Sequence, residues 1–133
     1  MTKLIITTEK DCIIDIQMNR PPVNALNLEL VEALHREIDA HTSSGAKGLI
    51  LSGREGIYSA GLDVKKLLEM DAGEISMFFK LFWGLMAKIS KSPIPIAAAI
   101  TGHSPAGGAV LANFCDYRVA AKGSFKIGMN EVF

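Results

Sequence analysis

Residues 96–108 read Ile-Ala-Ala-Ala-Ile-Thr-Gly-His-Ser-Pro-Ala-Gly-Gly, an apolar run that ends in a turn of small residues. The apolar run begins at residue 94, and its composition predicts a strand covered on both faces. The glycines that end the turn then open a predicted helix over residues 106–114. The same succession of apolar strand, small-residue turn and helix start recurs over residues 49–63. Strands that alternate with helices in this way predict an α/β fold with crossover connections.

Hydrophobic periodicity predicts the remaining elements. Strands are expected at residues 4–7, 12–18, 48–52 and 117–121, and helices after an N-cap at Asn27, over residues 64–70 and over residues 74–90. The first two strands are expected to form a hairpin with one solvated face, because apolar and polar residues alternate in the second. In the helix expected over residues 74–90, Phe and Met residues repeat at helical spacing and are expected in the core. Asp71, three residues before Glu74, indicates a capping box at its start.

The composition limits both size and partners. The 133 residues are enough for one ordinary domain, and 49% of hydrophobic residues allow a buried core. The formal net charge of +0 provides no overall positive field for nucleic acid or an anionic membrane. No signal peptide and no apolar run of transmembrane length is recognised, so we expect a cytoplasmic protein, or a mitochondrial or peroxisomal one after processing. Cys12 and Cys115 fit no zinc or redox spacing, and both are expected as reduced core residues.

The two small-residue turns, 59–63 and 104–108, are the candidate binding elements. Amides at a helix N-terminus lack intrahelical acceptors, and glycine lets a ligand approach the backbone. Each turn can therefore supply one hydrogen-bond donor to an oxyanion. The alternative interpretation is that the glycines only permit tight turns and close packing.

Motifs for three other chemistries nearly match the second turn, and each lacks a required group. Gly102 and Gly107 have P-loop spacing, but the two residues after Gly107 are not the Lys and Ser/Thr that bind phosphate and magnesium. Ser104 resembles a hydrolase nucleophile, but Pro105 has no N–H to donate to an oxyanion. No G-x-G-x-x-G occurs, so a dinucleotide site is not supported.

Few residues are candidates for acid–base chemistry. His35 and His41 are expected to be solvated on the first helix, and His103 is expected to shape its turn. Glu131 ends the sequence Gly-Met-Asn-Glu at 128–131 and lies among apolar residues. A carboxylate in such surroundings loses solvation, which raises its pKa and suits it to shuttle a proton near neutral pH.

Four motifs taken together carry a family resemblance. They are Ser-Ala-Gly-Leu-Asp at 59–63, Pro-Ala-Gly-Gly at 105–108, Cys-Asp-Tyr-Arg at 115–118 and Gly-Met-Asn-Glu at 128–131. In this order they resemble the enoyl-CoA hydratase/isomerase (crotonase) superfamily, and within it the Δ3,Δ2-enoyl-CoA isomerases. Residues 19–26 also resemble the first loop of that family. The resemblance implies a spiral of ββα units, with residues 1–133 as the N-terminal part of a crotonase-like core domain.

The resemblance also implies a ligand and a site. The substrate is expected to be an acyl-CoA thioester, with no cofactor beyond the coenzyme A of that substrate and no metal. The backbone amides of Leu62 and Gly107 would form the oxyanion hole, and Glu131 would be the catalytic base. The residues expected to contact the substrate are Ala25, Ser59, Ala60, Gly61, Leu62, Asp63, Gly107 and Asn130. A homo-oligomer is expected for a full-length chain, because the family forms trimers.

The choice of reaction depends on Val110. Hydratases of the family use two glutamates, and Val110 occupies the position of one of them, while Glu131 matches the other. Moving a proton from C2 to C4 needs only one carboxylate, so isomerisation of a 3-enoyl-CoA to a 2-enoyl-CoA is the expected reaction. Hydratase or another acyl-CoA chemistry is an alternative. Because family members are usually about twice as long, a fragment that acts as a non-catalytic CoA-binding or interaction module is another.

Overall fold

Five strands form the sheet on which the rest of the chain is built. The computed structural model describes residues 2–130 and orders this sheet β1-β2-β3-β5-β7. The strands are β1 (Ile5–Lys10), β2 (Ile13–Met18), β3 (Gly48–Ser52), β5 (Ile96–Ile100) and β7 (Tyr117–Ala120). β1 and β2 form an antiparallel hairpin, and all other neighbours in the sheet are parallel. The predicted hairpin and the predicted α/β fold with crossover connections are therefore confirmed.

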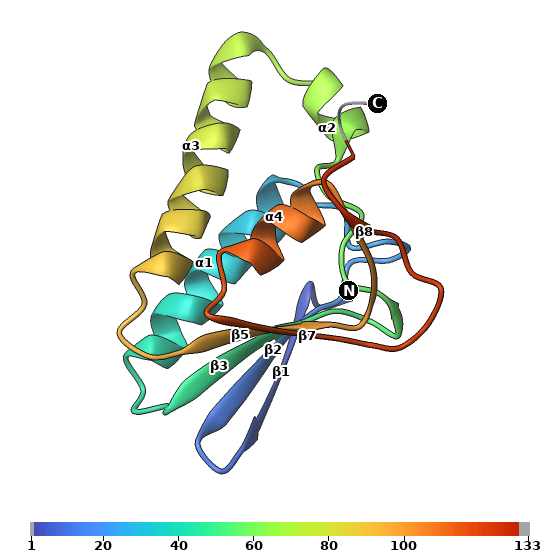
Figure 1. Cartoon of the computed structure of the whole chain (residues 1–133). Coiled ribbons are helices and arrows are strands. Elements are labelled where there is room, and N and C mark those ends of the chain that lie inside the picture. Colours follow the sequence, from blue (N-terminus) through green and yellow to red (C-terminus); the bar gives the residue numbers. More distant parts are fainter. Residues whose placement is uncertain (1, 131–133) are drawn as a thin grey trace.

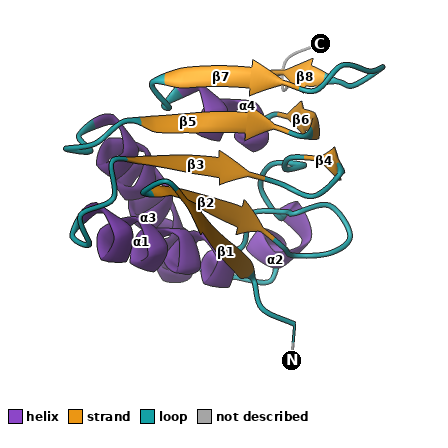
Figure 2. Ribbon diagram, turned by 90° about the horizontal axis from the view of Figure 1, so that it is seen from below, coloured by secondary structure: helices purple, strands orange, loops and turns teal. Residues whose placement is uncertain are grey.

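Helices cover one face of this sheet (Figure 1). They are α1 (Leu28–Thr42), α3 (Ala72–Ser90) and the short α4 (Gly107–Asn113), while α2 (Val64–Leu68) precedes α3. Figure 2, seen from below the view of Figure 1, shows no described element over the other face. Ala97 and Ala99 of β5 point to that face and are only half-buried. Among the described residues, the prediction that residues 94–100 form a strand covered on both faces is therefore wrong. Alanine is found on covered and on open faces of a sheet, so the run of alanines does not indicate that both faces are covered.

The core lies between the helices and the covered face of the sheet. Ile14, Ile16 and Met18 of β2 are buried, and the residues between them are half-buried, because side chains alternate along a strand. The helices contribute buried residues at helical spacing, namely Leu30, Val31, Leu34 and Ile38 from α1 and Phe78, Phe82, Leu85, Met86 and Ile89 from α3. The Phe and Met side chains at these positions of residues 74–90 therefore pack in the core, as predicted.

Both long helices begin at the caps that the sequence indicates. The side-chain oxygen of Asn27 accepts a hydrogen bond from the Leu30 amide at 3.0 Å. Asp71 and Glu74 each accept a hydrogen bond from the other's amide at 2.9 Å, which is a capping box. The caps satisfy amides that the helices themselves leave without acceptors. They also fix the points from which the loops enter α1 and α3.

A second, parallel sheet of three very short strands lies beside the ends of the first (Figure 2). Its strands are β4 (Gly56–Ile57), β6 (Gly102–Pro105) and β8 (Ile127–Gly128). A Cβ atom on Gly102 would lie 2.0 Å from the Gly56 carbonyl carbon, so only glycine fits where β4 and β6 approach. None of these three strands was predicted, because a strand of two to four residues is too short to show a periodic pattern. They complete the expected ββα units, because β3 and β4 precede α2 and β5 and β6 precede α4.

The two cysteines lie in different environments. Cys115 is 5% exposed and follows α4, as predicted for a core residue. Cys12 is exposed in the turn between β1 and β2, where its φ is 64°. The prediction that Cys12 is a core residue is therefore wrong, because the β1–β2 turn projects into solvent. Both thiols are free.

Candidate active site

The turn at 59–63 and the turn before α4 are in direct contact. A Cβ atom on Gly61 would lie 2.8 Å from the Gly107 nitrogen, and a Cβ atom on Gly107 would lie 3.2 Å from the Leu62 nitrogen. Gly108 approaches the same turn, since a Cβ atom there would lie 2.3 Å from the Ser59 carbonyl oxygen. The glycines thus permit close packing, which was one interpretation of the sequence. The structure also brings together the two residues predicted to form an oxyanion hole.

The amide of Leu62 has no acceptor among residues 2–130. The amides of residues 60 and 63 donate to carbonyls of the loop 23–26 at 2.9 and 3.0 Å, so this stretch pairs with the loop as a short parallel ladder. Successive amides in such a ladder point to opposite sides. The N–H of Leu62 therefore points away from the loop.

The amide of Gly107 likewise has no acceptor in the described part of the chain. Gly107 is the first residue of α4, and its N-cap, Ala106, makes no side-chain capping bond. Ala106 has φ 49° and ψ −120°, a conformation that costs a non-glycine residue of order 1–3 kcal/mol. Its own amide donates to the Gly128 carbonyl at 2.8 Å, which helps to hold it there. Strain of this kind is common in functional turns.

Ser59 and Asn24 form a buried polar contact beneath the turn. Both are 0% exposed. The Ser59 hydroxyl donates to the Asn24 carbonyl at 2.7 Å and accepts from the Gly61 amide at 3.1 Å. The Ser59 hydroxyl is therefore occupied by partners within the fold, and the contact of Ser59 with substrate stays a prediction. Asn24 lies in the loop 19–26 but was not among the predicted site residues. Its φ is 50°, and asparagine tolerates a positive φ better than most residues do.

Asp63 and Ala25 are linked by Arg20. The Arg20 guanidinium lies 2.8 Å from the Asp63 carboxylate and donates to the Ala25 carbonyl at 2.9 Å. The Asp63 side chain also accepts from the Lys66 amide at 3.2 Å and so caps α2. Asp63 and Ala25 are both half-buried, and Asp63 directly follows Leu62. The structure thus links these two predicted contact residues, one in the loop 23–26 and one in the turn 59–63, through the Arg20 side chain.

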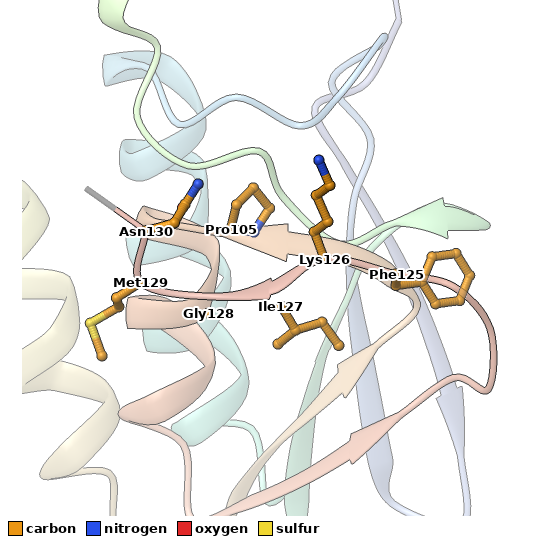
Figure 3. Close-up of a pocket in the computed structure, with 7 residues that line it drawn as sticks. All are labelled: Pro105, Phe125, Lys126, Ile127, Gly128, Met129 and Asn130. Carbon is orange, nitrogen blue, oxygen red and sulfur yellow. The ribbon is translucent and has the colours of Figure 1, made fainter. Parts of the chain in front are cut away.

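An open pocket of about 590 Å³ lies beside β8 and is lined by Pro105 and residues 125–130 (Figure 3). Lys126 and Asn130 point to one side of this segment, and Ile127 and Met129 point to the other (Figure 3). Asn130, predicted to contact substrate, is exposed here. Pro105 precedes the strained Ala106, so the pocket adjoins the second turn. Glu131, the predicted base, lies outside the described residues.

His103 holds the segment that leads to this pocket. Its Nδ1 accepts a hydrogen bond from the Lys126 amide at 3.0 Å, so the proton of a neutral ring lies on Nε2. The ring also packs edge-on against Phe125, with centroids 5.2 Å apart. These contacts agree with the prediction that His103 shapes its turn.

Tyr58, which precedes the first turn, and Cys115, which follows α4, are buried titratable groups that are unsuited to accept a proton at neutral pH. Burial raises the pKa of Tyr58 well above its usual value, and the nearby Cys115 thiol adds to the effect. Burial also raises the pKa of Cys115 to about 12, with the charge of Asp116 as a second cause. Both groups therefore stay protonated near pH 7. Asp63, the carboxylate of the first turn, is paired with Arg20.

The arrangement of ββα units is that of solved enoyl-CoA hydratases and isomerases. The chain superposes on human mitochondrial delta3-delta2-enoyl-CoA isomerase with a TM-score of 0.89 and 30% identity, over 97% of this chain and 52% of that one. It superposes on the enoyl-CoA hydratase of Thermoplasma volcanium with a TM-score of 0.89 and 26% identity, over 96% of this chain and 52% of that one. The predicted crotonase-like fold is therefore confirmed.

The sequence is similar to the same class of proteins. The family model described as enoyl-CoA hydratase/isomerase matches residues 8–132. Mitochondrial enoyl-CoA delta isomerase 1 of Rattus norvegicus is 34% identical over 119 residues, which are 87% of this chain and 41% of that protein. A probable enoyl-CoA hydratase of Bacillus subtilis is 34% identical over 119 residues, which are 88% of this chain and 46% of that protein. The chain belongs to the enoyl-CoA hydratase/isomerase family.

The chain spans a little less than half the length of these curated relatives, at 41% and 46%. Some relatives are named as mitochondrial proteins. Within the described residues, no helix combines the length and the apolar content needed to cross a bilayer.

Proposed function

We propose that this chain carries the thioester-binding part of an enoyl-CoA isomerase, which shifts the double bond of a 3-enoyl-CoA to the 2 position. The observation that carries the proposal is the backbone contact between the turn at 59–63 and Gly107. It places two amides side by side, and neither has an acceptor among the described residues. Two such donors are what a thioester oxygen needs when it takes on negative charge.

The proposed mechanism uses one base and two backbone donors. The amides of Leu62 and Gly107 bind the thioester oxygen and so acidify the C2–H bond. Glu131 removes the C2 proton, and the electron pair delocalises onto the oxygen as a dienolate. Glu131 then returns the proton at C4, which leaves the double bond between C2 and C3. Each donor typically contributes about 3–4 kcal/mol to stabilisation of the charged intermediate.

Isomerisation is favoured over hydration by Val110. Val110 is a half-buried apolar residue of α4 and cannot activate water. It stands where the resemblance places the second glutamate of a hydratase. Enoyl-CoA hydratase is the second candidate function, because a relative of that name is as similar in sequence as the isomerase.

Turnover by the full chain tests the proposal. The chain is incubated with a 3-enoyl-CoA, and formation of the conjugated 2-enoyl-CoA is followed by ultraviolet absorbance. We expect Glu131→Gln to abolish conversion and the matched variant Glu9→Gln, at an exposed position of β1, to leave it unchanged. Equal conversion by wild type and Glu131→Gln would remove Glu131 from the mechanism.

The other candidates give different results in the same experiment. Conversion of a 2-enoyl-CoA to a 3-hydroxyacyl-CoA would identify a hydratase. Acyl-CoA binding by calorimetry without turnover of either substrate would identify a non-catalytic module.

We also propose self-association, which is supported by exposed apolar side chains. Tyr117 and Val119 of β7 are 67% and 57% exposed, and Trp83 of α3 is 52% exposed. Apolar surface of this kind favours association. Light scattering should give a mass above that of one chain, and a monomeric mass would contradict this part of the proposal.

A further inference from the structure

The turn that carries the Leu62 amide is held from below by a buried asparagine. We infer that Ser59, held in place by Asn24, is a positioning residue and that this buried pair sets the direction of the Leu62 N–H. The inference rests on the proposed function, because it assigns to the Asn24–Ser59 pair a task in presenting the oxyanion donor.

The orientation of the Leu62 N–H is set by the peptide to which it belongs. That peptide is planar and also contains the Gly61 carbonyl, so fixing the carbonyl fixes the N–H. The Gly61 carbonyl accepts a hydrogen bond from the Leu26 amide at 2.8 Å. The preceding amide, that of Gly61, donates to the Ser59 hydroxyl at 3.1 Å. Two hydrogen bonds therefore hold the backbone immediately before the donor.

Asn24 holds in place the residues that make both of these hydrogen bonds. The main-chain carbonyl of Asn24 accepts a hydrogen bond from the Ser59 hydroxyl at 2.7 Å, which leaves the lone pairs of the hydroxyl oxygen free to accept from the Gly61 amide. Its side-chain nitrogen donates to the Met18 carbonyl at 3.1 Å and to the Tyr58 carbonyl at 3.0 Å. The loop that supplies Leu26 is thereby tied to β2 on one side and to the residue before Ser59 on the other.

The Asn24 side-chain oxygen completes the anchor. It accepts from the Arg20 amide at 2.7 Å, so both polar atoms of this 0% exposed side chain are used. A fully satisfied buried polar network fixes one arrangement of the backbone. On the other side of Leu62, the ion pair of Arg20 with Asp63 at 2.8 Å ties the same loop to the turn.

The contacts predict an effect on the chemical step without an effect on ligand binding. Neither Asn24 nor Ser59 has exposed surface with which to touch a substrate. Displacing a hydrogen-bond donor by about 1 Å lowers the rate of the catalysed reaction by up to about 100-fold. Loss of the Ser59 hydroxyl should therefore lower kcat by about 10- to 100-fold and leave KM within about twofold.

The test compares Ser59→Ala with Ser52→Ala in the full chain. Ser52 is also a buried serine, 5% exposed, and its hydroxyl donates to Asp15 at 2.6 Å on the large sheet, outside the turn contacts. Each protein is mixed with an acyl-CoA carrying ¹³C at the thioester carbonyl, and the carbonyl stretch is recorded by infrared difference spectroscopy. Hydrogen bonds to the oxygen lower this frequency, so the readout reports donor geometry and not stability.

We expect wild type and Ser52→Ala to lower the carbonyl frequency equally and Ser59→Ala to lower it less. An equal shift in all three proteins would overturn the inference and leave the proposed function standing. No shift in the wild type would overturn the proposed function and the inference with it. A fall in thermal stability that is similar in both variants, together with a shift lost only in Ser59→Ala, would separate positioning from general destabilisation.

Discussion

Replacing Gly61 by alanine should separate the two turns and destabilise the protein by more than backbone strain alone. Gly61 has φ +90°, and its added Cβ atom would lie 2.8 Å from the Gly107 nitrogen and 3.3 Å from the Pro105 carbonyl oxygen. The positive φ costs alanine about 1–2 kcal/mol. Overpacking against backbone that cannot rotate away adds about 1–3 kcal/mol. The expected total of about 2–5 kcal/mol is a large share of the about 5–15 kcal/mol that stabilises a domain.

Gly45→Ala is the matched control for this prediction. Gly45 has φ +86°, and nothing lies within 4 Å of the Cβ atom that it lacks. It therefore carries the same backbone strain without the contact, and should cost only about 1–2 kcal/mol. Urea unfolding at pH 7 gives the free energy of unfolding of both variants, and the difference isolates the contact between the turns. Equal losses in Gly61→Ala and Gly45→Ala would refute the close approach on which the site is built.

Three further predictions test the core, the thiols and a helix cap. Leu34→Ala should lose about 2–5 kcal/mol in urea unfolding, because Leu34 is 0% exposed, whereas Leu68→Ala, at an 81% exposed position of α2, should change stability by less than about 0.5 kcal/mol. Burial raises the pKa of Cys115 to about 12, so a thiol reagent at pH 8 should label Cys12 alone in the native protein and both cysteines in denaturant; native labelling of Cys115 would contradict its burial. Asp71→Ala should cost about 1 kcal/mol of unfolding free energy through loss of the capping box, and a cost near zero would show that the cap does not stabilise α3.

The raised pKa of Cys115 should also lower the stability of the protein at alkaline pH. The folded state keeps this proton up to about pH 12, whereas the unfolded chain loses it near the ordinary value of 9.0. Between these values the unfolded state binds fewer protons, so the free energy of unfolding falls as pH rises. Cys115→Ala should remove part of this fall.

The large sheet and its helices were predictable because they follow hydrophobic periodicity and caps. Residues 48–52 form β3 as expected, and Asn27 and Asp71 begin α1 and α3 as expected. The second sheet was not predictable, because β4 and β8 have two residues each and are stabilised by contacts between distant segments. The exposure of Cys12 was not predictable either, because the burial of a residue in a turn depends on how that turn is placed in the whole fold.

The site was predictable only in part. The turns at 59–63 and 105–108 were recognised from small residues and motif order, and the structure brings them together. The residues that hold the first turn were not recognised, because Asn24 acts through hydrogen bonds to backbone atoms, which no side-chain pattern encodes. Glu131 and its role stay predictions, since that residue lies outside the described part of the chain.

The proposed donors are backbone amides, and this determines which residues control the site. A substitution at Leu62 keeps the N–H, so side-chain changes at the donors themselves should matter less than changes at their supports. The supports are of two kinds, namely the glycines that let the turns touch and the buried Asn24–Ser59 pair that aims the peptide. The glycine contact links stability to function, because a Cβ atom at Gly61 separates the turns and strains the fold together. The Asn24–Ser59 pair separates these effects, since loss of one hydroxyl changes the direction of the donor while the glycine contact remains.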